Sequence, residues 1–225
     1  MTLTGAAAAA ATLELPALWG IGRYVVGDAT VQFPIDRTDL ERDTAWATDV
    51  LGEYGVQRGR RVHIISGGWE SPWYAPFFAA VRRLGGTYTC ADIFSFDARR
   101  TDLFLRRLTP HVVLGLPVDV AVGLADAEQL DNLRPVPHIL ARPDAASELV
   151  AAGIEAGVFA PVGAATAVTR PGSDLLSYDD REWRIDAPEG ELLVTTVGER
   201  AYRVSSAPTG IHGEVTGDGL VRLTG

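Results

Sequence analysis

Hydrophobic and polar positions in the middle of the chain alternate between two periods. Some segments repeat their apolar side chains every three or four positions, which is typical of helices with one buried face: residues 38–54, 71–84, 97–108 and 143–157. Short continuous apolar runs separate them and are typical of buried strands: residues 61–66, 87–93, 111–117, 137–141 and 158–163. Strands that alternate with helices pair in parallel through crossover connections. The pattern therefore predicts an α/β fold, with a parallel sheet flanked by helices.

The helical period stops near Thr166, and short strand patterns separated by Pro and Gly turns follow. The expected strands are residues 183–188, 191–196, 201–206 and 220–225. We therefore expect a disordered tail over residues 1–11, an α/β core over residues 12–165, and a small β-rich subdomain over residues 166–225 packed on the core.

Charge and composition exclude several classes of partner. The 225 residues include 20 basic ones, all arginine, and 29 acidic ones, so the formal net charge of −9 is opposite to what binding to nucleic acid requires. No apolar run approaches the roughly 20 residues that span a bilayer, so we expect no membrane partner. The single Cys90 cannot form an internal disulfide, which predicts a cytoplasmic location, and its spacing to the four histidines predicts no metal site.

The junction between the first buried strand and the next helix carries the candidate chemistry. In "RVHIISGGWESPWY" a Gly-Gly turn follows the strand, and Glu70 comes next, where open α/β sheets place ligand crevices. One interpretation makes Glu70 a general acid/base in apolar surroundings. The other makes it a carboxylate that interacts favourably with a helix N-terminus.

His63 is the second candidate catalytic residue, although a lone histidine in an apolar strand also fits a packed core or a subunit interface. Trp69, Trp73 and Tyr74 are candidate substrate-binding residues, because aromatic side chains beside a crevice suit a small, flat aromatic substrate. General packing is the alternative for all three. Six arginines are by default solvated surface residues, and one of them is a candidate to bind a substrate carboxylate: Arg37, Arg42, Arg82, Arg83, Arg99 or Arg100.

Two stretches resemble the adenylate-forming ligase superfamily, especially its phenylacetate–CoA-ligase-like members. Over residues 51–117, "LGEYGVQRGRRV" and "VRRLGG" resemble that family's helix, turn, strand and helix with an "LGA" turn, and "EGELLVTTVGERAYR" resembles its "GELV.TT" hairpin. Together the matches cover most of residues 38–215. The resemblance implies the N-terminal region of an acyl-CoA ligase fold.

The departures from that family bear on the cofactor. Such ligases bind ATP through a Ser/Thr/Gly-rich loop that ends in lysine, and this sequence has neither that loop nor any lysine. The glutamate of the family's "YG.TE" segment falls at Gly163, and its ribose-binding aspartate falls at Ile211. The chain also ends where a C-terminal domain with a catalytic lysine would begin. We therefore expect an ATP-independent protein, a shortened and degenerate relative of these ligases, with no cofactor.

Three hypotheses for function remain open. The chain resembles the bacterial β-carboline-forming Pictet–Spengler enzymes in size, in its candidate Glu and His, and in lacking cofactor motifs. That resemblance implies condensation and cyclisation of a tryptophan-like amine with an aldehyde, with Glu70 as acid/base and His63 as its hydrogen-bond partner. The alternatives are a non-catalytic ligase relic that binds an acyl or aryl ligand or a partner enzyme, and a half-enzyme completed by a separate chain. We also expect a homodimer, because a domain without its usual partner domain exposes apolar surface.

Overall fold

The computed structural model describes residues 17–224, and the tail predicted over residues 1–11 lies outside them. The first element of the described residues is an antiparallel hairpin of strands β1 (Leu18–Val26) and β2 (Ala29–Asp36), which leads into helix α2 (Arg37–Glu53). The spacing of Thr38 and Glu41 predicts a capping box at the start of this helix. The structure has the box two residues earlier: Asp39 N donates to Asp36 Oδ1 at 2.6 Å, and Asp36 N donates to Asp39 Oδ2 at 3.1 Å.

Five strands form the parallel part of the sheet, in the spatial order β4–β3–β5–β6–β7. Their bounds are β3 (Arg61–Ile65), β4 (Thr87–Ala91), β5 (Val112–Leu116), β6 (His138–Ala141) and β7 (Gly157–Val162). The helices between them are α3 (Ser71–Arg83), α4 (Ala98–Leu108), α5 (Val118–Asp126) and α6 (Pro143–Ala151), with 3-10 turns η1 (Gly68–Glu70), η2 (Ser95–Asp97) and η3 (Leu130–Leu133). The predicted α/β fold is confirmed.

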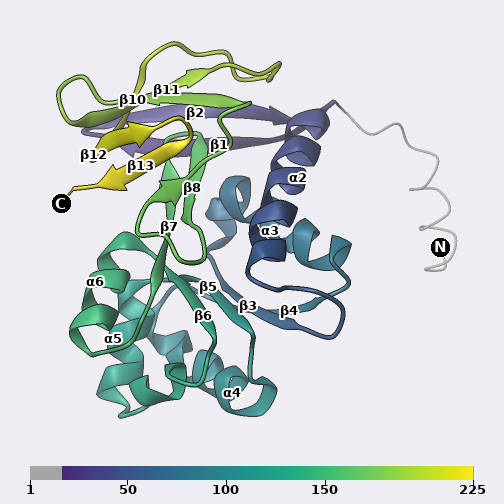
Figure 1. The fold of residues 1–225 in the computed structure, drawn as a ribbon, viewed down its shortest axis with the longest axis vertical. Helices are drawn as coiled ribbons and strands as arrows, with labels where there is room; N and C mark the ends of the chain where they lie inside the picture. The colour runs from purple at the N-terminus through teal and green to yellow at the C-terminus, as the bar shows by residue number, and fades with distance from the viewer. Residues whose placement is uncertain (1–16, 225) are drawn as a thin grey trace, which may run out of the picture.

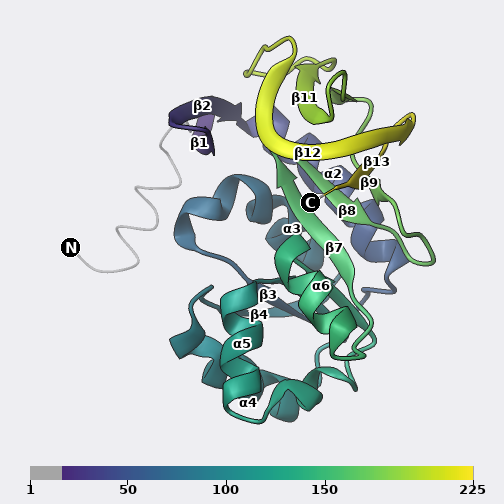
Figure 2. The same cartoon turned by 90° about the vertical axis from the view of Figure 1, so that its left-hand side faces the viewer.

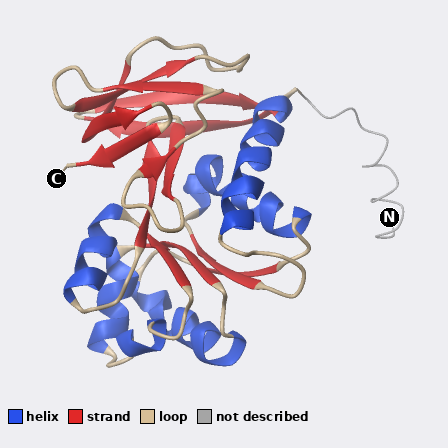
Figure 3. Ribbon diagram, in the orientation of Figure 1, coloured by secondary structure: helices blue, strands red, loops and turns tan. Residues whose placement is uncertain are grey.

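Helices cover both faces of the parallel strands (Figures 1 and 3). Val62 and Ile64 of β3 belong to the apolar cluster that includes α2 and α3, whereas Ile65 belongs to the cluster that includes α4, α5 and α6. Because both faces are buried, the inner strands β3, β5 and β6 have largely apolar sequences rather than alternating ones.

Beyond β7 the same sheet continues with antiparallel strands. In spatial order they are β8 (Ala165–Thr169), β9 (Leu176–Ser177), β13 (Leu220–Leu223), β12 (Ala207–Gly217), β11 (Glu191–Thr196) and β10 (Trp183–Asp186). Figure 2 shows the long β12 curving across one end of the molecule. The C-terminal part is thus rich in strands, as predicted. One 11-stranded sheet runs through both parts, and a domain boundary at residue 165 stays a prediction.

The structure differs from the predicted elements in several places. The hairpin β1–β2, helix α5 and strands β8, β9 and β12 form where the sequence pattern predicts no element. Residues 201–206, predicted as a strand, form a loop. Backbone N–H groups of this loop donate to side chains instead of to a neighbouring strand: Ala201 N to Asp39 Oδ2 at 3.1 Å and Ser206 N to Thr195 Oγ1 at 2.9 Å. These side-chain acceptors lie far away in the sequence or on another strand, so the local pattern cannot indicate them.

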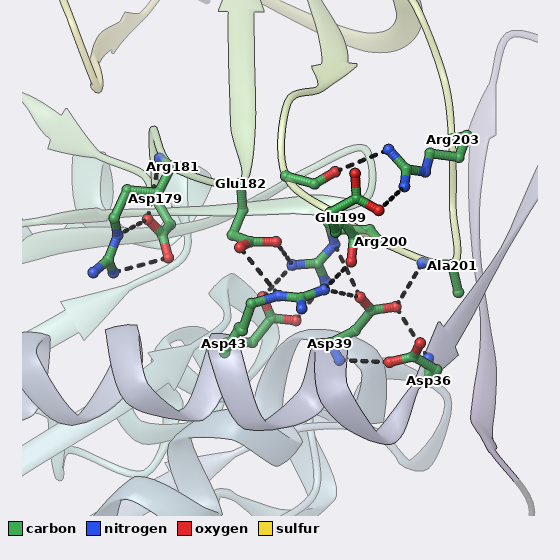
Figure 4. Close-up of polar contacts among 12 residues, drawn as sticks. Asp36, Asp39, Asp43, Asp179, Arg181, Glu182, Glu199, Arg200, Ala201 and Arg203 are labelled. Carbon is green, nitrogen blue, oxygen red and sulfur yellow. Dashed lines mark hydrogen bonds and ion pairs between the residues drawn. The ribbon is translucent and has the colours of Figure 1, made fainter.

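An ionic cluster attaches this loop to helix α2 (Figure 4). The buried guanidinium of Arg200 donates to both carboxylate oxygens of Asp43, at 2.7 and 2.8 Å, and to Glu182 Oε2 at 3.2 Å. It also lies 4.5 Å from the ring centre of Trp183, a cation–π distance. The loop between β11 and β12 is therefore held to α2 by several charged contacts at once.

Arg42 of α2 links the same cluster from the other side. Its guanidinium contacts Asp39 Oδ1 at 2.7 Å and Glu182 Oε1 at 3.1 Å, and it donates to the carbonyl of Glu199. Asp39 is itself 1% exposed and accepts hydrogen bonds from Asp36 N and Ala201 N. Every buried carboxylate in the cluster thus has a charged or backbone donor, which buried charges require.

Candidate functional site

A pocket of about 560 Å³ lies at the carboxyl ends of β3 and β7. Four elements form its walls: turn η1 with the start of α3, the turn after β7, the hairpin β1–β2, and strand β12. The predicted residues Trp69, Glu70 and Trp73 line it together with Gly163 and Ile211. This is the edge of a parallel sheet at which open α/β folds bind ligands.

Glu70 lines the pocket, but its carboxylate is firmly held. Arg142 Nη1 lies 2.7 Å from Oε1 and Arg142 Nη2 donates to Oε2 at 2.7 Å, which is a bidentate arrangement. Gly67 N also donates to Oε2 at 2.7 Å. Since Oε2 accepts two hydrogen bonds and Oε1 has one contact, only Oε1 keeps an acceptor position for a ligand.

Arg142 is the residue directly after β6, and its contacts connect the carboxyl end of β6 with the carboxyl ends of two other strands. Besides Glu70, it donates through Nε to the carbonyl of Gly115 at 3.3 Å, at the end of β5. Gly115 has φ of +80°, and a Cβ there would lie 2.4 Å from the Tyr74 hydroxyl, so only glycine fits. The pair Glu70–Arg142 therefore joins the carboxyl ends of β3, β5 and β6. The sequence offers no local signal for it, because the two residues are 72 positions apart.

The two tryptophans of the site have different environments. Trp73 is 6% exposed and its Nε1 donates to the carbonyl of Gly163 at 3.0 Å, so its ring is a fixed wall of the pocket. Trp69 is 53% exposed, with its ring centre 6.2 Å from that of Phe94. Of the two tryptophans, Trp69 is therefore the one whose ring surface is exposed to contact a ligand.

Tyr74 points away from the pocket into the core. It is 1% exposed, it packs 4.6 Å from the ring centre of Phe159, and it is not among the pocket residues. Burial raises the pKa of its hydroxyl, while the positive charge of Arg142 opposes that rise. Among the described residues the hydroxyl has no hydrogen-bond partner of standard geometry.

His63 of β3 points to the face of the sheet that α4 covers, whereas Glu70 lies in turn η1, beyond the end of that strand. Its side chain is fully buried between Thr89 and Thr101, whose Oγ1 atoms lie 2.9 Å from Nδ1 and 3.2 Å from Nε2, and its ring packs on Phe104. Burial lowers the pKa of His63 to about 4. None of these neighbours lines the pocket, so the structure does not bring the two predicted catalytic residues together.

The hairpin contributes a charged residue that sequence reasoning missed. Arg23 of β1 lines the pocket and is exposed, and its side chain makes no ion pair or hydrogen bond with any residue between 17 and 224. None of the six arginines proposed from the sequence lines the pocket. Arg23 could not be selected by pattern, because no element was predicted around it.

A larger pocket, about 810 Å³, lies at the opposite edge of the sheet, at the amino ends of β6 and β7. Its arginines are already engaged: Arg134 donates to the carbonyls of Ala152 and Gly153, and Arg170 donates to Ser177 Oγ and pairs with Glu53. We therefore place the candidate site at the carboxyl edge. Within the described part of the chain, no three His, Cys, Asp or Glu side chains are grouped to hold a metal, and no helix is long and apolar enough to cross a membrane.

Comparison with known proteins shows the fold. Solved structures of 2-hydroxyisobutyryl-CoA ligase are similar to this chain: an open conformation in complex with 2-HIB-AMP and CoA has a TM-score of 0.66 at 13% identity, covering 93% of this chain and 57% of the ligase. A postadenylation state with 2-HIB-AMP has a TM-score of 0.66 at 12% identity, covering 93% and 51%. This chain thus spans about half the length of these ligases. No protein-family model and no curated protein matches the sequence.

This similarity confirms the acyl-CoA-ligase-like fold that the sequence motifs predict. At 12–13% identity it shows the fold alone, and the chemistry has to be argued from the pocket.

Proposed function

We propose that this protein binds a small aromatic ligand in the carboxyl-edge pocket without using ATP. The observation that carries the proposal is the composition of the wall, in which Trp69 and Trp73 lie beside Gly163 and Ile211. Concave sites with aromatic walls and few polar groups are typical of small-molecule pockets. Among the three hypotheses drawn from the sequence, this proposal corresponds to the non-catalytic ligase relic that binds an aryl ligand.

The residues at the expected nucleotide positions support ATP independence. Ile211 supplies no carboxylate for a ribose. Gly163 has φ of +57°, and a Cβ there would lie 3.0 Å from Thr209 Cγ2, so the glutamate of the resembling family would be strained at this position. The full sequence also lacks lysine. The similar ligase structures hold 2-HIB-AMP, and we infer that this chain has lost the groups that such a ligand needs.

A Pictet–Spengler-type condensation of a tryptophan-like amine with an aldehyde is the second candidate. It is favoured by one observation: Glu70 Oε1 keeps an acceptor position in the same pocket as both tryptophans. In that reaction a base removes the ring proton after the indole carbon has attacked the iminium, and one carboxylate can serve. The hypothesis then requires Glu70 to act while Arg142 holds it.

Calorimetric titration of the full-length chain with aromatic acids, amides and amines tests the first proposal, and we expect saturable binding. Trp69→Ala should weaken it by about 3- to 10-fold through lost ring contact. Leu103→Ala is the control, since Leu103 on α4 is 45% exposed and outside the pocket, and it should leave affinity unchanged. Failure of every aromatic compound to bind would refute the proposal.

The condensation candidate has a separate test. The protein is incubated with tryptophan analogues and small aldehydes, and products are followed by mass spectrometry. A cyclised product formed by the wild type but not by Glu70→Gln supports catalysis. Binding without product formation leaves the non-catalytic role.

A further inference from the structure

Strand β4 ends the 11-stranded sheet and, among the described residues, has a neighbouring strand on one side only (Figure 1). Thr87 N donates to a carbonyl just before β3 at 3.0 Å, and the carbonyl of Ala91 accepts at 3.3 Å from the N–H just after β3. In a parallel pair, alternate residues direct their N–H and C=O groups to opposite sides of the strand. The backbone groups of Tyr88 and Cys90 therefore point to the open side of β4.

The sequence of β4 does not protect this open side. The strand contains no charged residue and no proline, and its pairing with β3 runs from Thr87 to Ala91 without a bulge. Thr87 and Cys90 are exposed. Charges, prolines and bulges are the usual devices that keep a further strand away from a sheet edge. An extended chain can therefore pair with β4 through main-chain hydrogen bonds.

Arginines from both faces of the sheet flank the edge. From α3, Arg82 Nη2 donates to the Tyr88 hydroxyl at 2.9 Å, and its guanidinium lies 5.4 Å from the centre of that ring. From α4, Arg100 contacts one carboxylate oxygen of Asp97 at 3.1 Å, and the other oxygen accepts the N–H of the residue directly after β4. Residues 82–100 carry four arginines and two aspartates, a net charge of +2 in a chain of net charge −9. The edge is thus locally positive in an acidic protein.

Two exposed aromatic rings lie just beyond the carboxyl end of β4. Phe94 and Phe96 are 38% and 72% exposed, and they stack with their ring centres 5.4 Å apart. Exposed apolar groups that adjoin one another mark interaction surfaces more often than scattered ones do. A chain that runs along β4 would reach these rings next, so they offer a packing surface for an apolar side chain at one of its ends.

We propose that β4 binds an extended acidic peptide segment of a partner protein as a further strand of the sheet. The outward groups of Tyr88 and Cys90 hold the main chain of the segment. Its carboxylates face the flanking arginines, and an apolar side chain packs on the two phenylalanine rings. The site lies outside the carboxyl-edge pocket, so the inference does not depend on the ligand of that pocket.

Two other occupants fit this edge less well. A second copy of the chain, paired through β4 about a twofold axis, would bring the same arginines together, and like charges across a strand pair are destabilising. A lipid surface would suit the arginines and the aromatic rings, but it offers no row of main-chain groups to Tyr88 and Cys90. Charge and backbone together therefore favour an acidic peptide.

Three synthetic peptides test the inference by NMR titration of the isotope-labelled 225-residue chain. The first is acetyl-Glu-Thr-Glu-Val-Glu-Phe-amide, the second has glutamine in place of each glutamate, and the third is the first with its backbone nitrogens methylated. We expect the first peptide to protect the amides of Tyr88 and Cys90 from hydrogen exchange. The second should bind about 3- to 10-fold more weakly, because it lacks the charges, and the third should not bind, because it cannot donate to β4.

Arginine variants test the charge at the edge. Arg82→Gln and Arg100→Gln should each weaken binding of the acidic peptide by about 2- to 5-fold and leave binding of the glutamine peptide unchanged. Arg184→Gln is the matched control, since Arg184 is an exposed arginine paired with a nearby aspartate on β10, the strand at the other end of the sheet. It should change neither affinity. Unchanged melting temperatures for all three variants show that the fold is intact.

Several outcomes would overturn the inference. Equal affinity for the acidic and glutamine peptides, or equal affinity for the acidic peptide and its methylated form, would each do so. Self-association that protects the Tyr88 and Cys90 amides without any peptide would assign the edge to a second copy. Binding to phosphatidylserine-containing vesicles while the peptides have no effect would assign it to a lipid surface. Absence of binding by every peptide would also overturn the inference.

Discussion

At the scale of single residues, the role of Glu70 in the site depends on its contact with Arg142. Its two short charged contacts join the ends of β3 and β6, and the Arg142 side chain is only 20% exposed. Replacing Glu70 by Gln removes the negative charge and leaves the guanidinium without its ionic partner. We expect the free energy of unfolding to fall by about 1–3 kcal/mol.

Urea denaturation measures that loss, with Glu53→Gln as the control. Glu53 also pairs with an arginine, Arg170, but its side chain is 52% exposed, so its loss should cost at most about 1 kcal/mol. The double variant Glu70→Gln/Arg142→Met should be less destabilised than the sum of the single variants. Additive losses would mean that the two side chains do not stabilise each other.

His63 makes stability depend on pH. Burial lowers its pKa to about 4, whereas an unfolded chain has a His pKa of about 6.5. Between these values the unfolded state binds the extra proton, so the stability that neutral His63 contributes is present above pH 6.5 and is lost as the pH falls towards 4. The full loss is about 3 kcal/mol. Urea denaturation from pH 7.5 down to pH 4 should therefore show a shallower decline for His63→Asn than for the wild type, and parallel declines would contradict this account.

At the scale of elements, Phe33 is the most buried side chain that packs the hairpin β1–β2 on the core. Phe33 packs against the rings of Tyr24, Trp73 and Tyr202 and over Gly22, where a Cβ would lie 2.1 Å from Phe33 Cζ. Phe33→Ala should lower the free energy of unfolding by about 3–5 kcal/mol and weaken ligand binding, because the pocket wall loses its anchor.

Val25→Ala is the control on the same hairpin. Val25 is 64% exposed, so its truncation should change stability by no more than about 0.5 kcal/mol. Denaturant unfolding of both variants gives the comparison. A Phe33→Ala variant as stable as Val25→Ala would show that the hairpin contributes little to the fold.

The loop between β11 and β12 depends on Arg200 for its attachment to α2. Arg200→Met leaves Asp43 and Glu182 without their main cationic partner, and we expect a loss of about 3–5 kcal/mol in the free energy of unfolding. Arg203→Met, in the same loop, removes an ion pair between side chains that are 58% and 90% exposed and should cost at most about 1 kcal/mol. Similar losses of unfolding free energy for the two variants, measured by denaturant unfolding, would show that the ionic cluster does not hold the loop to α2.

Sequence reasoning succeeded where an element is specified by its own residues. The buried strands and amphipathic helices of the parallel part follow from local periodicity, and the Gly-Gly turn correctly placed Trp69 and Glu70 at a strand end. It failed where the position of a residue depends on contacts with residues that are distant in the sequence. Arg142 contacts Glu70 only because β6 lies two strands from β3 in the sheet, and local hydrophobic patterns do not predict the order of the strands. Residues 201–206 form a loop because distant side chains accept their N–H groups.

At the scale of the whole molecule, the chain has the acyl-CoA-ligase-like fold, and Gly163 and Ile211 line a pocket at the carboxyl edge of its sheet. The homodimer expected from the sequence stays a prediction. Light scattering at micromolar concentration measures it, and we expect twice the mass of 24.0 kDa. A monomer would mean that the apolar surface of the chain does not require a second copy.

The central claim is that the pocket binds an aromatic ligand without ATP, and a single calorimetric comparison tests this claim most directly. Indole-3-acetate is titrated into the full-length chain in the absence and in the presence of millimolar Mg-ATP. We predict the same affinity and the same heat in both titrations, because Gly163 and Ile211 supply no group for a nucleotide. Binding that appears only with ATP, or that is strengthened by it, would contradict the account.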